Sequence, residues 1–164
     1  MTIFIKNKHT LQIDDFKFKC CVGKKGFTKN KKEKDKKTPK GIFELGALYY
    51  RKDRIQKPQT KITTKIIKKS FRWCDEPNDK TNYNKLITKP NNIKSETLYR
   101  SDYKYDLLIP IEYNTKKRIP GNGSAIFIHL TKNYNGTAGC IALSKKDFLI
   151  LLKLIDKKTK IKIN

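Results

Sequence analysis

The 164-residue sequence has few of the side chains that usually bind metals or form disulfides. It contains two histidines, His9 and His129, and four cysteines without a CxxC pair, so neither a zinc site nor a disulfide framework is expected. No apolar run approaches the length of a membrane-spanning helix. The length fits a single domain over residues 1–164, and nothing in the composition requires a metal or an organic cofactor.

Acidic residues and arginine are also scarce. The chain has 15 acidic against 39 basic residues, a formal net charge of +24, and only five of the basic residues are arginine. Such a charge would suit nucleic acid or another polyanion. However, base and phosphate recognition usually relies on arginine, and aromatic side chains are not interleaved with the lysines as a stacking surface requires. Nucleic acid is therefore not the expected partner, although attraction to an acidic substrate and a polyanion-binding module remain alternatives.

The first twenty residues lack the apolar run and the small-residue cleavage site of a signal peptide. As the sequence stands, this predicts a cytoplasmic location. If a leader has been removed from it, a periplasmic or cell-wall-associated location is expected instead.

Hydrophobic alternation predicts a mainly β domain. Pro110 predicts that its strand lies at an edge or a bulge, and the apolar run 124–130 is the best candidate for a central buried strand. Residues 71–103 show little periodicity and are expected to form a long irregular segment. The candidate strands are residues 2–5, 11–13, 16–20, 42–45, 62–67, 107–113, 124–130 and 159–163.

One helix is predicted near the C-terminus. Ser144 is a suitable N-cap, Asp147 lies three positions on in place of a capping-box glutamate, and residues 148–155 are largely apolar.

A cysteine lies between the predicted central strand and this helix, in the small-residue loop GTAGC that ends at Cys140. Small residues allow a substrate carbonyl to approach the backbone, whose N–H groups can stabilise an oxyanion. A helix beginning just after the thiol would favour the thiolate, and His129 could return across a hairpin-like loop to act as its base. The alternative is a buried apolar cysteine and an unrelated core histidine.

The order IFIHL, a glycine-containing loop, TAGCIALS and a helix resembles the active-site signature of the L,D-transpeptidase catalytic domain (YkuD-type). Upstream, DKKTPKGIFELG resembles the family's TP-x-G turn and strand. FRWCDEPNDKTNYNKLI, LYRSDYKYDLLIPIEYN and PGNGSAIFIHL resemble successive blocks of one branch of small bacterial members. Together these blocks cover about residues 20–155.

The resemblance implies a β-sandwich-like domain with a helix following the cysteine loop. It implies that Cys140 attacks the carbonyl of the third, diamino-acid residue of a peptidoglycan stem tetrapeptide, releases the terminal D-Ala and forms a thioester. His129 would be the base, Gly139 and Cys140 would supply the oxyanion-binding N–H groups, and the carbonyl of Leu130 would orient the imidazole. The candidate substrate-binding residues are Thr137, Ala138, Arg100 and Trp73.

The chain departs from the family pattern at three positions. Ala138 stands where many members have a second histidine, Ala142 where many have arginine, and Leu130 where glycine is common. Lysines are expected to replace the missing basic groups. Several residues of the branch's blocks are expected to hold the long segment rather than to line a cleft: Trp73, Asp75, Asn84, Tyr105 and Asp106. Cys20, Cys21 and Cys74 are expected in the core.

The resemblance leaves the fate of the thioester open. Attack by an amine gives a cross-link, whereas attack by water gives an L,D-carboxypeptidase. A cytoplasmic protein would trim muropeptides during recycling, so both activities on a stem peptide or muropeptide remain candidates.

Overall fold

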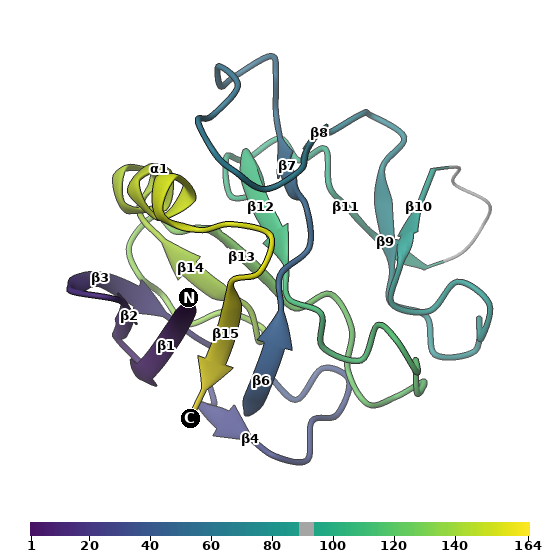
Figure 1. Ribbon diagram of the computed structural model, residues 1–164. Coiled ribbons are helices and arrows are strands. Elements are labelled where there is room, and N and C mark those ends of the chain that lie inside the picture. Colours follow the sequence, from purple (N-terminus) through teal and green to yellow (C-terminus); the bar gives the residue numbers. More distant parts are fainter. Residues whose placement is uncertain (89–93) are drawn as a thin grey trace.

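Short strands dominate the chain, as the hydrophobic alternation predicts. A computed structural model describes residues 1–88 and 94–164, in which it places fifteen strands and one helix (Figure 1). The elements are β1 (Thr2–Asn7), β2 (Thr10–Ile13), β3 (Phe16–Cys21), β4 (Phe27–Thr28), β5 (Thr38–Pro39), β6 (Gly41–Glu44), β7 (Leu48–Tyr50), β8 (Thr64–Ile66), β9 (Arg72–Cys74), β10 (Leu86–Ile87), β11 (Ser95–Thr97), β12 (Leu107–Pro110), β13 (Phe127–Leu130), β14 (Ile141–Leu143), α1 (Lys145–Leu154) and β15 (Lys160–Ile163).

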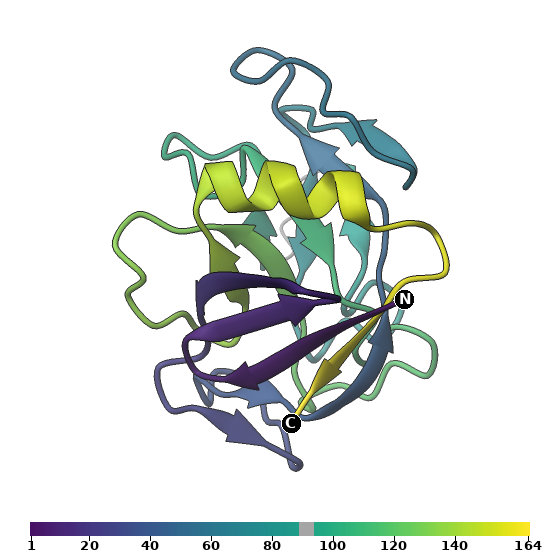
Figure 2. The ribbon, with the colours of Figure 1, turned by 60° about the vertical axis from the view of Figure 1, so that its left-hand side comes forward.

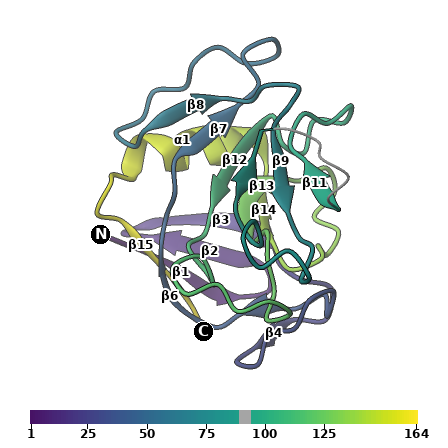
Figure 3. The ribbon, with the colours of Figure 1, turned by 90° about the vertical axis from the view of Figure 1, so that its right-hand side faces the viewer.

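Ten of these strands form one curled mixed sheet in the order β6-β15-β1-β2-β3-β14-β13-β12-β7-β8. Its two ends turn toward each other, and α1 lies across the space between them (Figure 2). The expectation of a mainly β domain with a helix after the cysteine loop is therefore confirmed. A separate small sheet, β10-β9-β11, lies on the far side of β12 and β13 from the β1–β3 strands (Figures 1 and 3).

The central strands separate two hydrophobic clusters because successive side chains of a strand point to opposite faces. On one face, Ile128 and Leu130 of β13 pack with α1 and the β1–β3 strands in the main core. On the other face, Phe127 packs with Trp73 of β9 and with Tyr105 in a second, smaller cluster. Cys140 belongs to this second cluster, so the small sheet covers the face on which the candidate nucleophile lies.

Two local predictions about the central strands were wrong. The central strand begins at Phe127 rather than at residue 124, because Ala125 has a positive φ of 52° that breaks the extended backbone. β12 is an interior strand between β13 and β7, not an edge strand. Pro110 is tolerated there because it ends β12, beyond the two residues that pair with β7.

The segment 71–103, predicted to be irregular, contains all three strands of the small sheet. Each strand is only two or three residues long, which is too short for a period to be recognised in the sequence. The capped helix is confirmed: the Ser144 side chain accepts a hydrogen bond from the Asp147 N–H, and the helix buries its own side chains Phe148, Leu151 and Leu152. No helix in the described part of the chain is long and apolar enough to span a membrane.

Candidate active site

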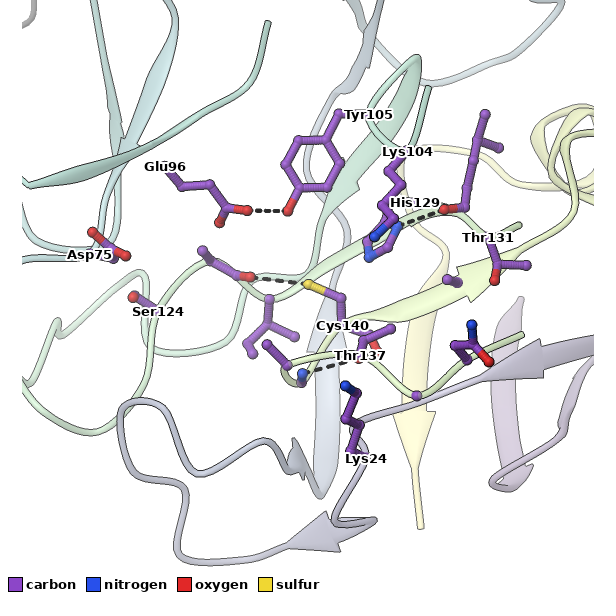
Figure 4. A pocket seen from close by; sticks show the side chains of 18 of the residues that line it. Lys24, Asp75, Glu96, Lys104, Tyr105, Ser124, His129, Thr131, Thr137 and Cys140 are labelled. Atoms are coloured by element: carbon purple, nitrogen blue, oxygen red, sulfur yellow. Dashed lines mark hydrogen bonds between the residues drawn. The ribbon is translucent and has the colours of Figure 1, made fainter. Parts of the chain in front are cut away.

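A cavity of about 520 Å³ opens between the small sheet and the cysteine loop (Figure 4). Cys140 and His129 both line it, and both side chains are about 7% exposed. The sequence places these residues eleven positions apart, and the fold brings them to one wall of the same cavity. A nucleophile and a candidate base that face one cavity have the arrangement that acyl transfer requires.

The pairing of β13 with β14 explains why the two side chains face the same cavity. The strands are parallel, with Ile128 opposite Ile141 and His129 opposite Ala142. Ile128 and Ile141 both point into the main core, so their neighbours His129 and Cys140 point to the opposite face, into the cavity. The connection is thus a loop between parallel neighbours, not the hairpin-like turn that the sequence suggested.

Two threonines fix the backbone of the cysteine loop. The Thr137 hydroxyl donates to the Cys140 carbonyl at 2.6 Å and accepts the Gly139 N–H at 3.0 Å. The Thr38 hydroxyl donates to the Gly139 carbonyl at 2.8 Å, which gives the upstream TP-x-G motif a structural role. Gly139 has φ of +146°, and a Cβ there would lie 2.9 Å from the Lys37 carbonyl oxygen, so only glycine fits without strain.

The oxyanion donors proposed from the sequence differ in their present partners. The Gly139 N–H is donated to Thr137, whereas the Cys140 N–H has no acceptor among residues 1–88 and 94–164. The Cys140 N–H is therefore free to donate a hydrogen bond to the negative oxygen that develops during the reaction. The role of Gly139 stays a prediction, and it requires the Thr137 hydroxyl to release that N–H.

His129 is held in one tautomer by the backbone. Its Nδ1 lies 2.9 Å from the Leu130 carbonyl oxygen, and because a carbonyl only accepts, Nδ1 carries the proton. Nε2 is then the unprotonated nitrogen that can accept a proton. Burial lowers the pKa of His129 to about 4, so the ring is neutral at pH 7. The Tyr105 ring packs edge-on against it at 5.3 Å between centroids.

The Cys140 thiol rests as a neutral group. It donates to the Ala125 carbonyl at 3.3 Å and accepts the Phe127 N–H at 3.4 Å. Burial, and after it the negative charge of Glu96, raise the pKa of this thiol to about 12. The expected stabilisation of a thiolate by the following helix was wrong: β14 separates the thiol from α1, which begins only at Lys145.

Most of the predicted site residues come together. Leu130, Thr137, Ala138, Gly139 and Arg100 all line the cavity with the candidate pair. The guanidinium of Arg100 is engaged by Asp102 through two hydrogen bonds of 2.9 and 2.6 Å.

Trp73 does not line the cavity. It packs at 5.1 Å between ring centroids against Phe127, which in turn contacts the Cys140 sulfur. Trp73 therefore supports the cavity wall from behind and is not placed to contact a substrate.

Asn84 connects the long segment to the cysteine's surroundings. Its side-chain oxygen accepts the Trp73 indole N–H at 2.9 Å and the Ala125 N–H at 3.0 Å. Its amide nitrogen donates to the Tyr113 and Asn114 carbonyls at 3.0 and 2.8 Å. This buried amide thus holds the residue whose carbonyl contacts the Cys140 thiol, which agrees with the structural role predicted for it.

Sequence reasoning missed the cluster of carboxylates in the cavity and the lysine on the opposite side of it. Asp75 and Glu96 lie on one side of Cys140, and Lys104 lies on the other side, beside His129 (Figure 4). Glu33 also lines the cavity, and its charge acts on both Asp75 and Glu96. Asp75 was expected only to hold the loop, and Glu33 and Glu96 lie in stretches with no chemical motif. The one signal available was the scarcity of acidic residues in so basic a chain. No group of three or more His, Cys, Asp or Glu in the described ranges is arranged to hold a metal ion.

Comparison with known proteins gives one match. The family model of the L,D-transpeptidase catalytic domain (YkuD) matches residues 1–163, nearly the whole sequence. Searches among curated proteins and among solved structures found no significant match.

Proposed function

The chain belongs to the L,D-transpeptidase catalytic domain family, and from this membership we propose that it cleaves peptidoglycan stem tetrapeptides through a thioester on Cys140. Membership implies L,D-transpeptidase-type activity on peptidoglycan. The proposal adds the bond that is attacked, the one after the third residue, and the residues that attack it.

One observation supports the proposal above the others: His129, on β13, and Cys140, directly before the parallel neighbour β14, both face one cavity. The Leu130 carbonyl fixes the imidazole with Nε2 unprotonated, as a base requires. The Cys140 N–H has no acceptor in the described part of the chain and is available to the oxyanion.

In the first half-reaction, the Cys140 thiol transfers its proton to Nε2 of His129, and the sulfur attacks the carbonyl carbon of the third residue. The carbonyl oxygen becomes negative and accepts the Cys140 N–H. Collapse of this intermediate breaks the peptide bond, His129 returns the proton to the amine, and D-Ala leaves. For this proton transfer the thiol must first leave its hydrogen bond with the Ala125 carbonyl.

In the second half-reaction, His129 removes a proton from an amine or a water molecule that attacks the thioester carbonyl, the C–S bond breaks, and His129 returns the proton to the Cys140 sulfur. An amine gives the transpeptidation product, and water gives the L,D-carboxypeptidase product. The lysines of the cavity, including Lys24 and Lys104, are suited to bind the substrate carboxylates.

Mass spectrometry tests this proposal with purified protein, a disaccharide-tetrapeptide and an added D-amino acid. We expect loss of D-Ala and an acyl adduct on Cys140, both abolished by Cys140→Ala. Cys74→Ala is the matched control, because Cys74 is buried but does not line the cavity. An exchanged product identifies the transpeptidase and a tripeptide identifies the carboxypeptidase, whereas no adduct and no product from a folded protein would refute the thioester.

A further inference from the structure

Three carboxylates gather at one end of the cavity although the chain carries a net charge of +24. Glu33 comes from the loop between β4 and β5, Asp75 follows β9, and Glu96 lies on β11. Five ion pairs occur in the described ranges, and all of them use other acidic residues. Lysine is abundant, so three acidic groups left without an ion pair beside the proposed nucleophile are unusual.

The hydrogen bonds of these carboxylates leave capacity for a ligand. Glu96 accepts from the Tyr105 hydroxyl, and one Glu33 oxygen accepts from Tyr83 at 2.5 Å and Ser124 at 3.0 Å. The Asp75 Oδ1 atom is buried and has no hydrogen-bond partner among residues 1–88 and 94–164. A buried carboxylate oxygen without a donor is costly, so this atom is an acceptor that an N–H group of a ligand could satisfy.

Burial of these carboxylates and the repulsion between their charges also favour the binding of a cation. Burial raises the pKa of Asp75 and of Glu96, and the charge of Glu33 raises both further. Since the described groups are not arranged to hold a metal ion, an organic cation fits this end better than a metal does.

The opposite side of the thiol has the opposite charge. Lys104 lies beside His129, across the cavity from Asp75 and Glu96 (Figure 4). Cys140 therefore lies between Lys104 and the carboxylates of Asp75 and Glu96, although Lys34 and Arg100 also line this cavity and lower the pKa of Asp75 and of Glu96, respectively. Such a cavity matches a ligand that carries an ammonium group on one side of the reacting carbonyl and a carboxylate on the other.

Resting on the proposed function, we propose that Glu33, Asp75 and Glu96 form an ammonium subsite for the side-chain amine of the acyl donor's diamino acid. The subsite selects donors whose amine is free and rejects those whose amine is already acylated. The Tyr105 ring lies against His129 and its hydroxyl bonds Glu96, so the length of one tyrosine side chain separates the acidic end from the base. An extended diamino-acid side chain is of comparable length.

The position of the subsite couples recognition to chemistry. The Glu96 charge opposes ionisation of the Cys140 thiol, and a bound ammonium group offsets that charge. A donor with a free amine therefore assists formation of the thiolate, whereas an acylated donor leaves the thiol in its resting state.

Two compounds test the subsite: a disaccharide-tetrapeptide with a free side-chain amine, and the same compound acetylated on that amine. Calorimetric titration of Cys140→Ala protein measures binding without turnover. We expect the free-amine compound to bind at least ten-fold more tightly, as a charge-assisted hydrogen bond allows. Adding Asp75→Asn or Glu96→Gln should bring the ratio close to one by weakening only the free-amine compound, and Glu44→Gln, at an exposed acid outside the cavity, should leave it unchanged.

Equal binding of the two compounds to Cys140→Ala protein would overturn the subsite, as would variants that weaken both compounds equally. Affinity for the acetylated compound also reports that each variant is folded. A preference for the free amine without any turnover by the wild-type protein would refute the proposed function and leave the subsite standing. Turnover of both compounds at the same rate and with the same affinity would support the proposed function and refute the subsite.

Discussion

The resting state of Cys140 leads to a quantitative prediction about its reactivity. A thiol whose pKa is raised from 9.0 to about 12 has roughly a thousand-fold less thiolate at pH 7 than an ordinary cysteine. Because only the thiolate reacts with iodoacetamide, alkylation of the free enzyme should be slow at pH 7 and should rise about ten-fold for each pH unit, without a plateau below about pH 10.

The assay follows alkylation of the peptide that contains Cys140 by mass spectrometry between pH 6 and 10. Restricted access to a side chain that is about 7% exposed slows the reaction equally at each pH, so the slope isolates ionisation from access. Glu96→Gln should raise the rate throughout this range because it removes a charge that opposes the thiolate, and Glu44→Gln should not. A plateau below about pH 9, or a fast reaction at pH 7, would refute the neutral resting thiol.

Three further predictions concern the groups around the nucleophile. Asn84→Ala leaves buried donors and acceptors without partners and should lower the free energy of unfolding by about 2–4 kcal/mol in chemical denaturation. A loss below about 1 kcal/mol would contradict the stabilising role of the Asn84 hydrogen bonds. Thr137→Val should reduce kcat about ten- to a hundred-fold with little change in KM, and Thr137→Ser should restore it, because the hydroxyl shapes the oxyanion loop. As pH falls from 6.5 to 4, the unfolded chain protonates its imidazole before the folded protein does, so the wild type should lose about 3 kcal/mol of stability relative to His129→Gln; parallel pH profiles would argue against a buried neutral ring.

The sequence was most informative where a pattern repeats along the chain. Alternation in residues 2–20 and 159–163 predicted β1, β2, β3 and β15, and the Ser144 cap predicted the start of the helix. The small-residue loop and the strand-end histidine singled out Cys140 and His129, which the fold places at one cavity. The strands and the cap are local in sequence, and local rules of side-chain direction and capping are sufficient to predict them. The assignment of Cys140 as a nucleophile and His129 as its base depended instead on the resemblance to the family.

Features that depend on distant parts of the chain could not be predicted in this way. The positive φ of Ala125 is supported by Asn84, forty-one positions earlier, and no local rule indicates that contact. The acidic end combines Glu33, Asp75 and Glu96 from three separate loops or strands, each of which resembles an ordinary surface acid in the sequence. The thiol pKa likewise depends on burial beneath a sheet whose strands were too short to recognise.

The pairing of β1 with β15 has a consequence for how the chain folds. These strands, from opposite ends of the sequence, are hydrogen-bonded neighbours inside the ten-stranded sheet, and β3 pairs with β14 in the same way. During synthesis β1 and β3 therefore remain without these partners until β14 and β15 have been made, because pairing between strands distant in sequence cannot form earlier. Until then the β1–β3 strands carry unpaired edges, which makes the unfinished domain prone to aggregation.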